Sequence, residues 1–379
     1  MKKISKKVIS AGHICLDITP VFPGNRSYND IASILIPGKL INMDKAEVST
    51  GGSVANTGLA LKKLGCDVTL LGKVGNDHFG KLIKSIVRSY GAGGIISDDN
   101  SSTSYSVVLA VPGIDRVFLH NPGANDTFSS DDISDEALSD AVLFHFGYPT
   151  LMKNMYEKEG SELVSLFKRV KNNGIATSMD MAAIDPGSDA AEADWNKILD
   201  NTLKYVDFFL PSFEELCFML DRGKYENMIS SGQDITGIID MDKDVKPLAK
   251  KCIDMGCRTV VIKCGTRGLF YMTGKREELE NIGHRLDINL DDWADRSGIQ
   301  PCFKVEIVRS ATGAGDTSIA AFLAALINGR SISDCVRLAA AEGACCVTGY
   351  DALSGLKDLD ELEQAISDGW EMMGEMICW

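Results

Sequence analysis

The sequence predicts a doubly wound α/β fold, in which a mainly parallel sheet is covered by helices on both faces. Short, nearly continuous apolar runs rich in Val, Ile and Leu alternate with amphipathic helical stretches. Strands that are buried on both faces read as continuous apolar runs, because neither face meets water. With 379 residues, of which 45% are apolar, the chain can bury a substantial core. Ligands of such a sheet bind beyond the carboxyl ends of its strands.

The elements expected from this alternation follow one another along the chain. The expected strands are Val8–Ile14, Val68–Lys73, Val142–Phe146, Ile175–Asp180, Phe208–Leu210 and Thr259–Lys263. The expected helices are Ala55–Leu64, Phe79–Tyr90, Ser161–Asn172, Glu214–Asp221 and Val245–Met255.

Segments without a crossover helix break this rhythm. Thr19–Glu47 is irregular, whereas Thr103–Leu119 alternates in the β manner around a Pro-Gly pair, as a hairpin does. We expect these segments to form a small β lid of residues 19–47 and 101–125 on an α/β core of residues 1–18, 48–100 and 126–379. Arg276–Pro301 is polar and acidic, and we interpret it as an insertion without an assigned role.

Charge and cysteine content narrow the classes of partner and compartment. Lys and Arg number 39 against 53 Asp and Glu, for a net charge of −14. An acidic surface argues against binding to nucleic acid or an anionic membrane, although local cations can still bind an anionic substrate. No apolar run approaches the ~20 residues that span a bilayer. The Cys count is 11, without C-x-x-C metal spacing, which favours reduced thiols and the cytoplasm.

The strongest motif is Ala-Thr-Gly-Ala-Gly-Asp-Thr at residues 311–317, followed by the small, apolar, helical Ser318–Ile327. Glycines before a helix let the backbone approach a ligand, and the first helical amides then point at it. Such an anion hole suits the charge on a transferring phosphoryl group. Asp316 would lie where an acceptor hydroxyl arrives and could take its proton. From the residues alone, Asp316 could equally be a helix N-cap.

A second motif opens another helix. Gly51 and Gly52 precede it, and Asn56 falls in its first turns, where an amide can donate to and accept from sugar hydroxyls. The alternative is a glycine-opened packing helix. The segment lacks the Gly-Lys-Ser/Thr of a Walker A loop. It also lacks the G-x-G-x-x-G spacing, and no strand is expected directly before the helix, so a dinucleotide site is disfavoured.

Together these motifs resemble the two signatures of the ribokinase-like (PfkB) carbohydrate kinase family. The resemblance covers nearly the whole chain, and its segments occur in the order found in the family. The further segments that carry it are Ala11–Asp17, Lys73–Gly80, His120–Asn125, Leu210–Glu215 and Lys263–Gly268.

The resemblance implies a role for each matching residue. Asp316 is the expected catalytic base, and the amides of Gly313, Ala314 and Gly315 the expected anion hole. The acceptor sugar should contact Asp17, Gly51, Gly52 and Asn56. ATP should lie along Lys263, Gly265, Gly268 and Thr312, with Ala341–Val347 flanking the adenine, and Glu215 should organise the water shell of Mg²⁺. The lid of this family often also serves as a homodimer contact.

Two positions depart from the family pattern. Many members carry Asp where this chain has Ser310, and that Asp helps to bind an activating monovalent cation, so potassium dependence is left open. Ser212 replaces the Asn of the Asn-x-x-Glu motif, which weakens one anchor of the Mg²⁺ and phosphate network. Glu215 is retained, and we expect magnesium to be essential.

The leading hypothesis is phosphoryl transfer from ATP to a hydroxyl of a sugar or sugar acid. A nucleoside kinase of the same fold needs an apolar slot for the base, which Phe22, Tyr28 and Phe118 could supply. A sugar-phosphate acceptor needs cations near the lid, and the candidates are Arg26, Lys39 and Arg116. A non-catalytic sugar or nucleotide sensor is a further alternative, although a sensor has no need of a proton acceptor at Asp316. The acceptor itself and the oligomeric state are not specified by the sequence.

Overall fold

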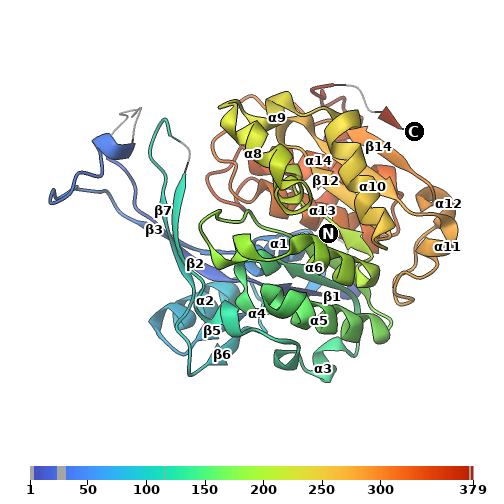
Figure 1. The fold of residues 1–379 in the computed structure, drawn as a ribbon, viewed down its shortest axis with the longest axis horizontal. Helices are drawn as coiled ribbons and strands as arrows, with labels where there is room; N and C mark the ends of the chain where they lie inside the picture. Colours follow the sequence, from blue (N-terminus) through green and yellow to red (C-terminus); the bar gives the residue numbers. More distant parts are fainter. Residues whose placement is uncertain (1–3, 24–30, 115, 375–376, 379) are drawn as a thin grey trace.

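The computed structural model describes residues 4–23, 31–114, 116–374 and 377–378 and contains a nine-stranded sheet (Figure 1). Neighbouring strands from β4 to β12 are parallel, and β13, β14 and β15 are added antiparallel. This confirms the predicted mainly parallel α/β fold. In spatial order the strands are β15 (Ile377–Cys378), β14 (Ser297–Gln300), β13 (Leu269–Thr273), β12 (Thr259–Lys263), β11 (Phe208–Phe209), β10 (Ala176–Asp180), β9 (Ala141–Gly147), β1 (Ile4–Gly12) and β4 (Cys66–Leu71).

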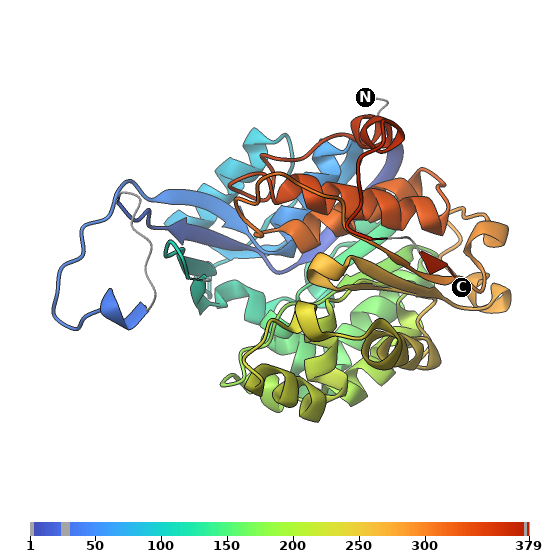
Figure 2. The ribbon, with the colours of Figure 1, turned by 90° about the horizontal axis from the view of Figure 1, so that it is seen from above.

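Helices cover both faces of the sheet (Figure 2). One hydrophobic cluster lies under α1 (Ser53–Lys63), α2 (His78–Ser89), α13 (Ala314–Ile327), α14 (Ile332–Cys346) and α15 (Leu359–Ser367). The other lies under α3 (Asp135–Leu138), α5 (Ser161–Asn172), α6 (Trp195–Thr202), α7 (Phe213–Leu220) and α10 (Lys246–Asp254). The remaining α-helices are α4 (Lys153–Tyr156), α8 (Arg222–Ser230), α9 (Ile235–Ile238), α11 (Arg276–Leu279) and α12 (Leu290–Trp293). Within the part of the chain described, no helix has the length and apolar character to cross a membrane.

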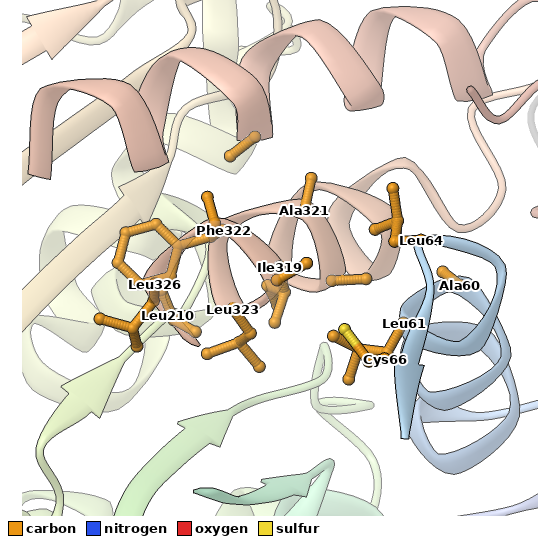
Figure 3. Packing of buried hydrophobic residues seen from close by; sticks show 14 of the residues in the cluster. Ala60, Leu61, Leu64, Cys66, Leu210, Ile319, Ala321, Phe322, Leu323 and Leu326 are labelled. Atoms are coloured by element: carbon orange, nitrogen blue, oxygen red, sulfur yellow. The ribbon is translucent and has the colours of Figure 1, made fainter. Parts of the chain in front are cut away.

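Helix α13 is the buried centre of this architecture. It is apolar on all sides, as expected of a helix that meets no water. Figure 3 shows Phe322 and Leu326 beside Leu210, whereas Ala60 and Leu61 of α1 lie nearer the other end of the helix. The ring of Phe322 also meets the ring of Phe208 on β11 edge-on. Because α13 is enclosed, its first turn, with Asp316, has a fixed place over the strand ends.

The segments for which a lid is predicted contribute to a second sheet, which projects from the core (Figure 1). Its order is β3 (Glu47–Gly51), β2 (Cys15–Thr19), β7 (Tyr105–Leu109) and β8 (Val117–Asn121). The antiparallel β7–β8 hairpin lies where the sequence predicts one. The chain enters this sheet at Cys15, before the predicted boundary at residue 18. A third, small sheet pairs β5 (Lys73–Gly75) with β6 (Ile96–Asp98).

Strand β3 contradicts the expectation that no strand directly precedes the second glycine motif. It pairs with β2 as far as Gly51, and α1 begins at Ser53. The strand is mostly exposed and polar, so no apolar run marks it. The G-x-G-x-x-G spacing is still absent.

The interpretation of Arg276–Pro301 as an insertion is wrong for its C-terminal part. Ser297–Gln300 forms β14 of the main sheet, and Trp293 is buried beside Phe208 and Phe322. The buried residues are spaced irregularly among acidic ones, so neither a helical nor a strand period is visible in the sequence.

Glu342 on α14 predicts a specific dependence of stability on pH. The side chain is fully buried, its Oε1 has no hydrogen-bond partner, and burial raises its pKa from 4.5 to about 8. A carboxyl whose folded-state pKa is raised stabilises the fold while protonated, and this contribution is lost as pH rises through the folded pKa. Glu342→Gln should therefore be more stable than wild type at pH 9, by on the order of 3–5 kcal/mol, and similar at pH 5. Urea unfolding at both pH values tests this.

The matched control is Glu226→Gln on α8, where the side chain is exposed. This variant should follow the wild-type curve at both pH values. Equal loss of stability between pH 5 and 9 in wild type and Glu342→Gln would contradict the prediction.

Candidate active site

The side chains that could bind a ligand or take part in catalysis gather at the carboxyl ends of the parallel strands, where a doubly wound fold binds its ligands. Gly12, Gly147 and Asp180 end β1, β9 and β10 and lie in register across the sheet. Lys263 ends β12 and is bridged to Ser212, which precedes α7. Because parallel strands end at one edge, residues far apart in sequence meet there.

Asp316 lies in the first turn of α13 and is 4% exposed. Its carboxylate accepts hydrogen bonds from Asn56 Nδ2 at 3.0 Å and Thr57 Oγ1 at 3.2 Å, both on α1. The hydroxyl of Tyr148 lies 2.8 Å from each carboxylate oxygen. Gly313, in the left-handed region at φ 77°, is the N-cap residue of the helix. The alternative interpretation of Asp316 as an N-cap is therefore wrong.

A charged cluster lies beside Asp316. Lys263 Nζ is 2.6 Å from Asp180 Oδ1 and has little exposure to solvent. Glu215 forms a reciprocal capping box with Ser212 at the start of α7. Burial raises the pKa of Asp180, Glu215 and Asp316, and Lys263 opposes this in each case. The pKa of Lys263 is raised although burial lowers it, because Asp180 and Glu215 outweigh the burial.

Two cavities meet at Asp316. The smaller, about 310 Å³, is lined by Lys263, Gly265 and Gly315, among others. The larger, about 780 Å³, extends towards the lid and is lined by Asp17, Asn56 and other residues. The residues common to both cavities are Tyr148, Glu215, Gly313 and Asp316. This is the arrangement that a reaction between two separately bound substrates requires.

Most of the residues predicted for the acceptor lie together. Asp17, Gly52 and Asn56 line the larger cavity. Gly51 packs against Asp17, and a Cβ there would lie 2.1 Å from Asp17 Oδ2, so only glycine leaves that carboxylate in place. Cys15 Sγ donates to Asp17 Oδ1 at 3.3 Å.

The residues predicted for the nucleotide are less uniformly placed. Lys263, Gly265 and Gly315 line the smaller cavity, whereas Thr312 lines the larger one. Gly268 lines neither cavity. Its φ is 93°, and a Cβ there would lie 2.1 Å from Gln300 O, so the backbone conformation and the close packing both require glycine. Ala314 donates its amide to Ala311 O at 3.3 Å and lines neither cavity.

Several site residues were not identified from the sequence. Asp180 could have been suspected from its place at a strand end, but Tyr148 carries no such signal. His13 and His120 both line the larger cavity, with their Nε2 atoms 3.3 Å apart. Ser106 Oγ lies 3.0 Å from His120 Nδ1. Their residue types alone do not reveal that they share a wall.

Among the residues described, no group of three or more His, Cys, Asp or Glu side chains is placed to hold a metal by itself. The donors fit Mg²⁺ held largely through phosphate oxygens and water, which is how this ion usually binds. Glu215 and Asp180 supply carboxylates beside the smaller cavity, and Lys263 is the cation beside them. A divalent cation would offset the remaining negative charge.

The family model of the pfkB family carbohydrate kinases matches residues 7–359. The chain belongs to this family. The carbohydrate kinase is 27% identical over 303 residues to an uncharacterised sugar kinase of Archaeoglobus fulgidus, covering 79% of this chain and 98% of that protein. It is 24% identical to fructokinase-2 of Oryza sativa subsp. japonica, covering 95% and 94%. Its fold matches Arabidopsis thaliana ribokinase complexed with ribose and ATP, with a TM-score of 0.65, 21% identity, and coverage of 95% and 98%.

Proposed function

We propose that this kinase transfers the terminal phosphoryl group of ATP to a sugar hydroxyl, with Asp316 as general base. The observation that carries this proposal is the position of Asp316, where the two cavities meet at the start of a buried helix. A carboxylate at that point can accept the proton as the hydroxyl attacks. The N-terminal amides of α13, with Gly313 and Gly315 leaving room for the ligand, would stabilise the charge that develops on the phosphoryl group.

ATP would occupy the smaller cavity, as a neighbour of the same fold holds ATP with ribose. Lys263 would contact the phosphates, and Asp180 fixes its Nζ by the 2.6 Å ion pair. Glu215 and Asp180 would hold Mg²⁺ through its waters, and the ion supplies charge neutralisation for the phosphates. Gly265 lets the backbone come close to the nucleotide at a φ of 54°. Potassium dependence stays a prediction to be tested.

The charge of the larger cavity favours a neutral sugar over a sugar acid. Its carboxylates include Asp17, Asp126, Asp185 and Asp189. Its cations are Arg116 and Lys153, and Lys153 Nζ lies within 3.9 Å of Asp189. A surplus of carboxylates repels an anionic acceptor, whereas carboxylates and imidazoles hydrogen-bond well to hydroxyl groups.

The second candidate acceptor is a nucleoside. Phe118 and Tyr156 line the larger cavity with Leu151 and Ile184, a wall on which a base could stack. Phe22, also considered for this slot, is instead buried in a small lid cluster. Tyr28 and Arg26 lie outside the described residues. Of the cations considered for a sugar phosphate, Arg116 lines the cavity, whereas Lys39 is exposed.

The test is ADP release from Mg-ATP with a panel of neutral sugars, sugar acids, sugar phosphates and nucleosides. We expect turnover with a neutral sugar and none with its acid counterpart. Turnover with nucleosides alone would support the second candidate. Binding of ATP or a sugar without turnover of any acceptor would favour the sensor and contradict the proposal.

We also propose that the lid mediates a homodimer and that the enzyme is cytoplasmic. Large apolar side chains are exposed on β3, on β8 and on the loop before β3: Leu35, Ile36, Leu40, Ile41, Val48, Val117, Phe118 and Leu119. Large apolar side chains exposed on the same sheet and on the loop that leads to it are typical of an interface. A solution mass of twice 41.0 kDa would support the dimer.

The cysteines support the proposed cytoplasmic location. Those described are free thiols, as a reducing compartment favours.

A further inference from the structure

Tyr148 has a position that phosphoryl transfer by this fold does not by itself require. It follows β9 directly and lines both cavities at the point where they meet. Its hydroxyl is the donor that reaches both oxygens of Asp316, at 2.8 Å each. Asn56 and Thr57, by contrast, each contact one oxygen.

The backbone of Tyr148 is held in an unfavourable conformation. Its φ of 67° and ψ of 44° lie in the left-handed region, a backbone conformation that residues with a Cβ rarely adopt. The conformation is fixed from both sides, because Tyr148 N donates to Asp180 O and Leu151 N donates to Tyr148 O. Gly147 lets this turn approach α1, since a Cβ there would lie 1.7 Å from Ser53 Oγ. The fold thus maintains strain at the residue that aims a hydroxyl at Asp316.

We propose that Tyr148 is a positioning residue, whose hydroxyl holds the Asp316 carboxylate at the junction of the cavities as the proton acceptor. The inference rests on the proposed function, in which Asp316 is the base. A carboxylate has about four acceptor positions. Asn56 and Thr57 take one on each oxygen, and the single proton of the Tyr148 hydroxyl fills only one more at a time, so a position remains for the acceptor hydroxyl. A donor that meets both oxygens prevents rotation of the carboxylate and favours its ionised form.

The consequence appears in the dependence of kcat/KM on pH. Burial raises the pKa of Asp316, whereas the hydrogen bonds from Asn56 and Tyr148 lower it. Loss of the Tyr148 hydroxyl therefore raises the pKa of the base, so that the variant needs a higher pH to work. The other titratable groups that face this pair retain their contacts: Lys263, Asp180, Glu215, His13 and Cys346.

The test is the pH profile of kcat/KM for Tyr148→Phe against wild type, with Mg-ATP and the acceptor found by the panel. We expect the acidic limb to move up by about one to two pH units, which is the shift that corresponds to the loss of one hydrogen bond to a charged group. Well above the limb, kcat/KM should stay within several-fold of wild type. A uniform loss at every pH would mean a merely structural role and would overturn the proposal, as would an unmoved limb. A higher kcat/KM throughout would mean that the hydroxyl blocks the base.

Further variants keep the test decisive. Tyr90→Phe, at the exposed end of α2 and outside both cavities, should leave the acidic limb in place. If Tyr148→Phe does not fold, 3-fluorotyrosine at position 148 retains the hydroxyl as a stronger donor and should move the limb to lower pH. Asp316→Asn is measured in parallel. Full activity in that variant would refute the base itself, whereas an inactive Asp316→Asn with an unmoved Tyr148→Phe limb would refute only the positioning role.

Discussion

Asp316→Asn is expected to lower kcat by at least ~10²-fold, the usual contribution of a positioned general base. Asn has nearly the same shape but cannot take the proton of the acceptor hydroxyl. The amide oxygen can still accept from Asn56 Nδ2 and the Tyr148 hydroxyl, and the amide NH2 group can donate to Thr57 Oγ1, so the fold and both cavities should persist. ADP release at saturating ATP and acceptor measures kcat, and calorimetric titration with ATP checks that nucleotide binding is retained.

The matched control is Asp17→Asn, on β2 in the wall of the larger cavity. If Asp17 binds the acceptor, this variant should raise the acceptor KM, leave the KM for ATP unchanged, and lower kcat much less than Asp316→Asn does. Full activity of Asp316→Asn would refute the assignment of the base. An equal loss of kcat in both variants would mean that the two carboxylates do not have separate roles.

Lys263→Met is the second change with a large expected effect, because it acts on both stability and activity. Removing Lys263 leaves Asp180 buried without its ion-pair partner, close to Glu215 and Asp316. Loss of one member of a buried pair typically lowers the free energy of unfolding by about 3–5 kcal/mol. Loss of a cation that stabilises the transferring phosphoryl group should lower kcat/KM for ATP by ~10²–10³-fold. Urea unfolding at pH 7 and ADP release measure the two effects.

The double variant Asp180→Asn with Lys263→Met separates these effects. It removes both charges, so stability should largely return while activity stays low. Lys243→Met removes an exposed lysine that pairs with Asp240 on the surface, and it should change the free energy of unfolding by less than about 1 kcal/mol. If Lys263→Met is as active as wild type, Lys263 does not contact the phosphates. If the double variant is as unstable as the single one, the ion pair is not what holds the cluster together.

Local patterns in the sequence were sufficient for the fold class and for the place of Asp316 at the start of a buried helix. The buried strands are continuous apolar runs, and helix α13 is apolar all round after a Gly-Ala-Gly turn, so both can be read within a few residues. Strand β3 and the segment around Trp293 could not be read in this way. Their buried positions follow no period, because each meets the rest of the protein through only a few side chains.

The constellation around Asp316 depends on contacts between distant parts of the chain. Tyr148 lies 168 residues from Asp316, and Lys263 lies 83 residues from Asp180. His13 and His120 are 107 residues apart and share a wall because β2, which begins just after His13, pairs with β7, and β7 pairs with β8, which carries His120. The glycines and apolar runs follow from backbone conformation and burial, which act over neighbouring residues and so leave a pattern in the sequence. Which carboxylate meets which cation or hydroxyl depends on the order of strands in the sheet, and only the tertiary structure decides that.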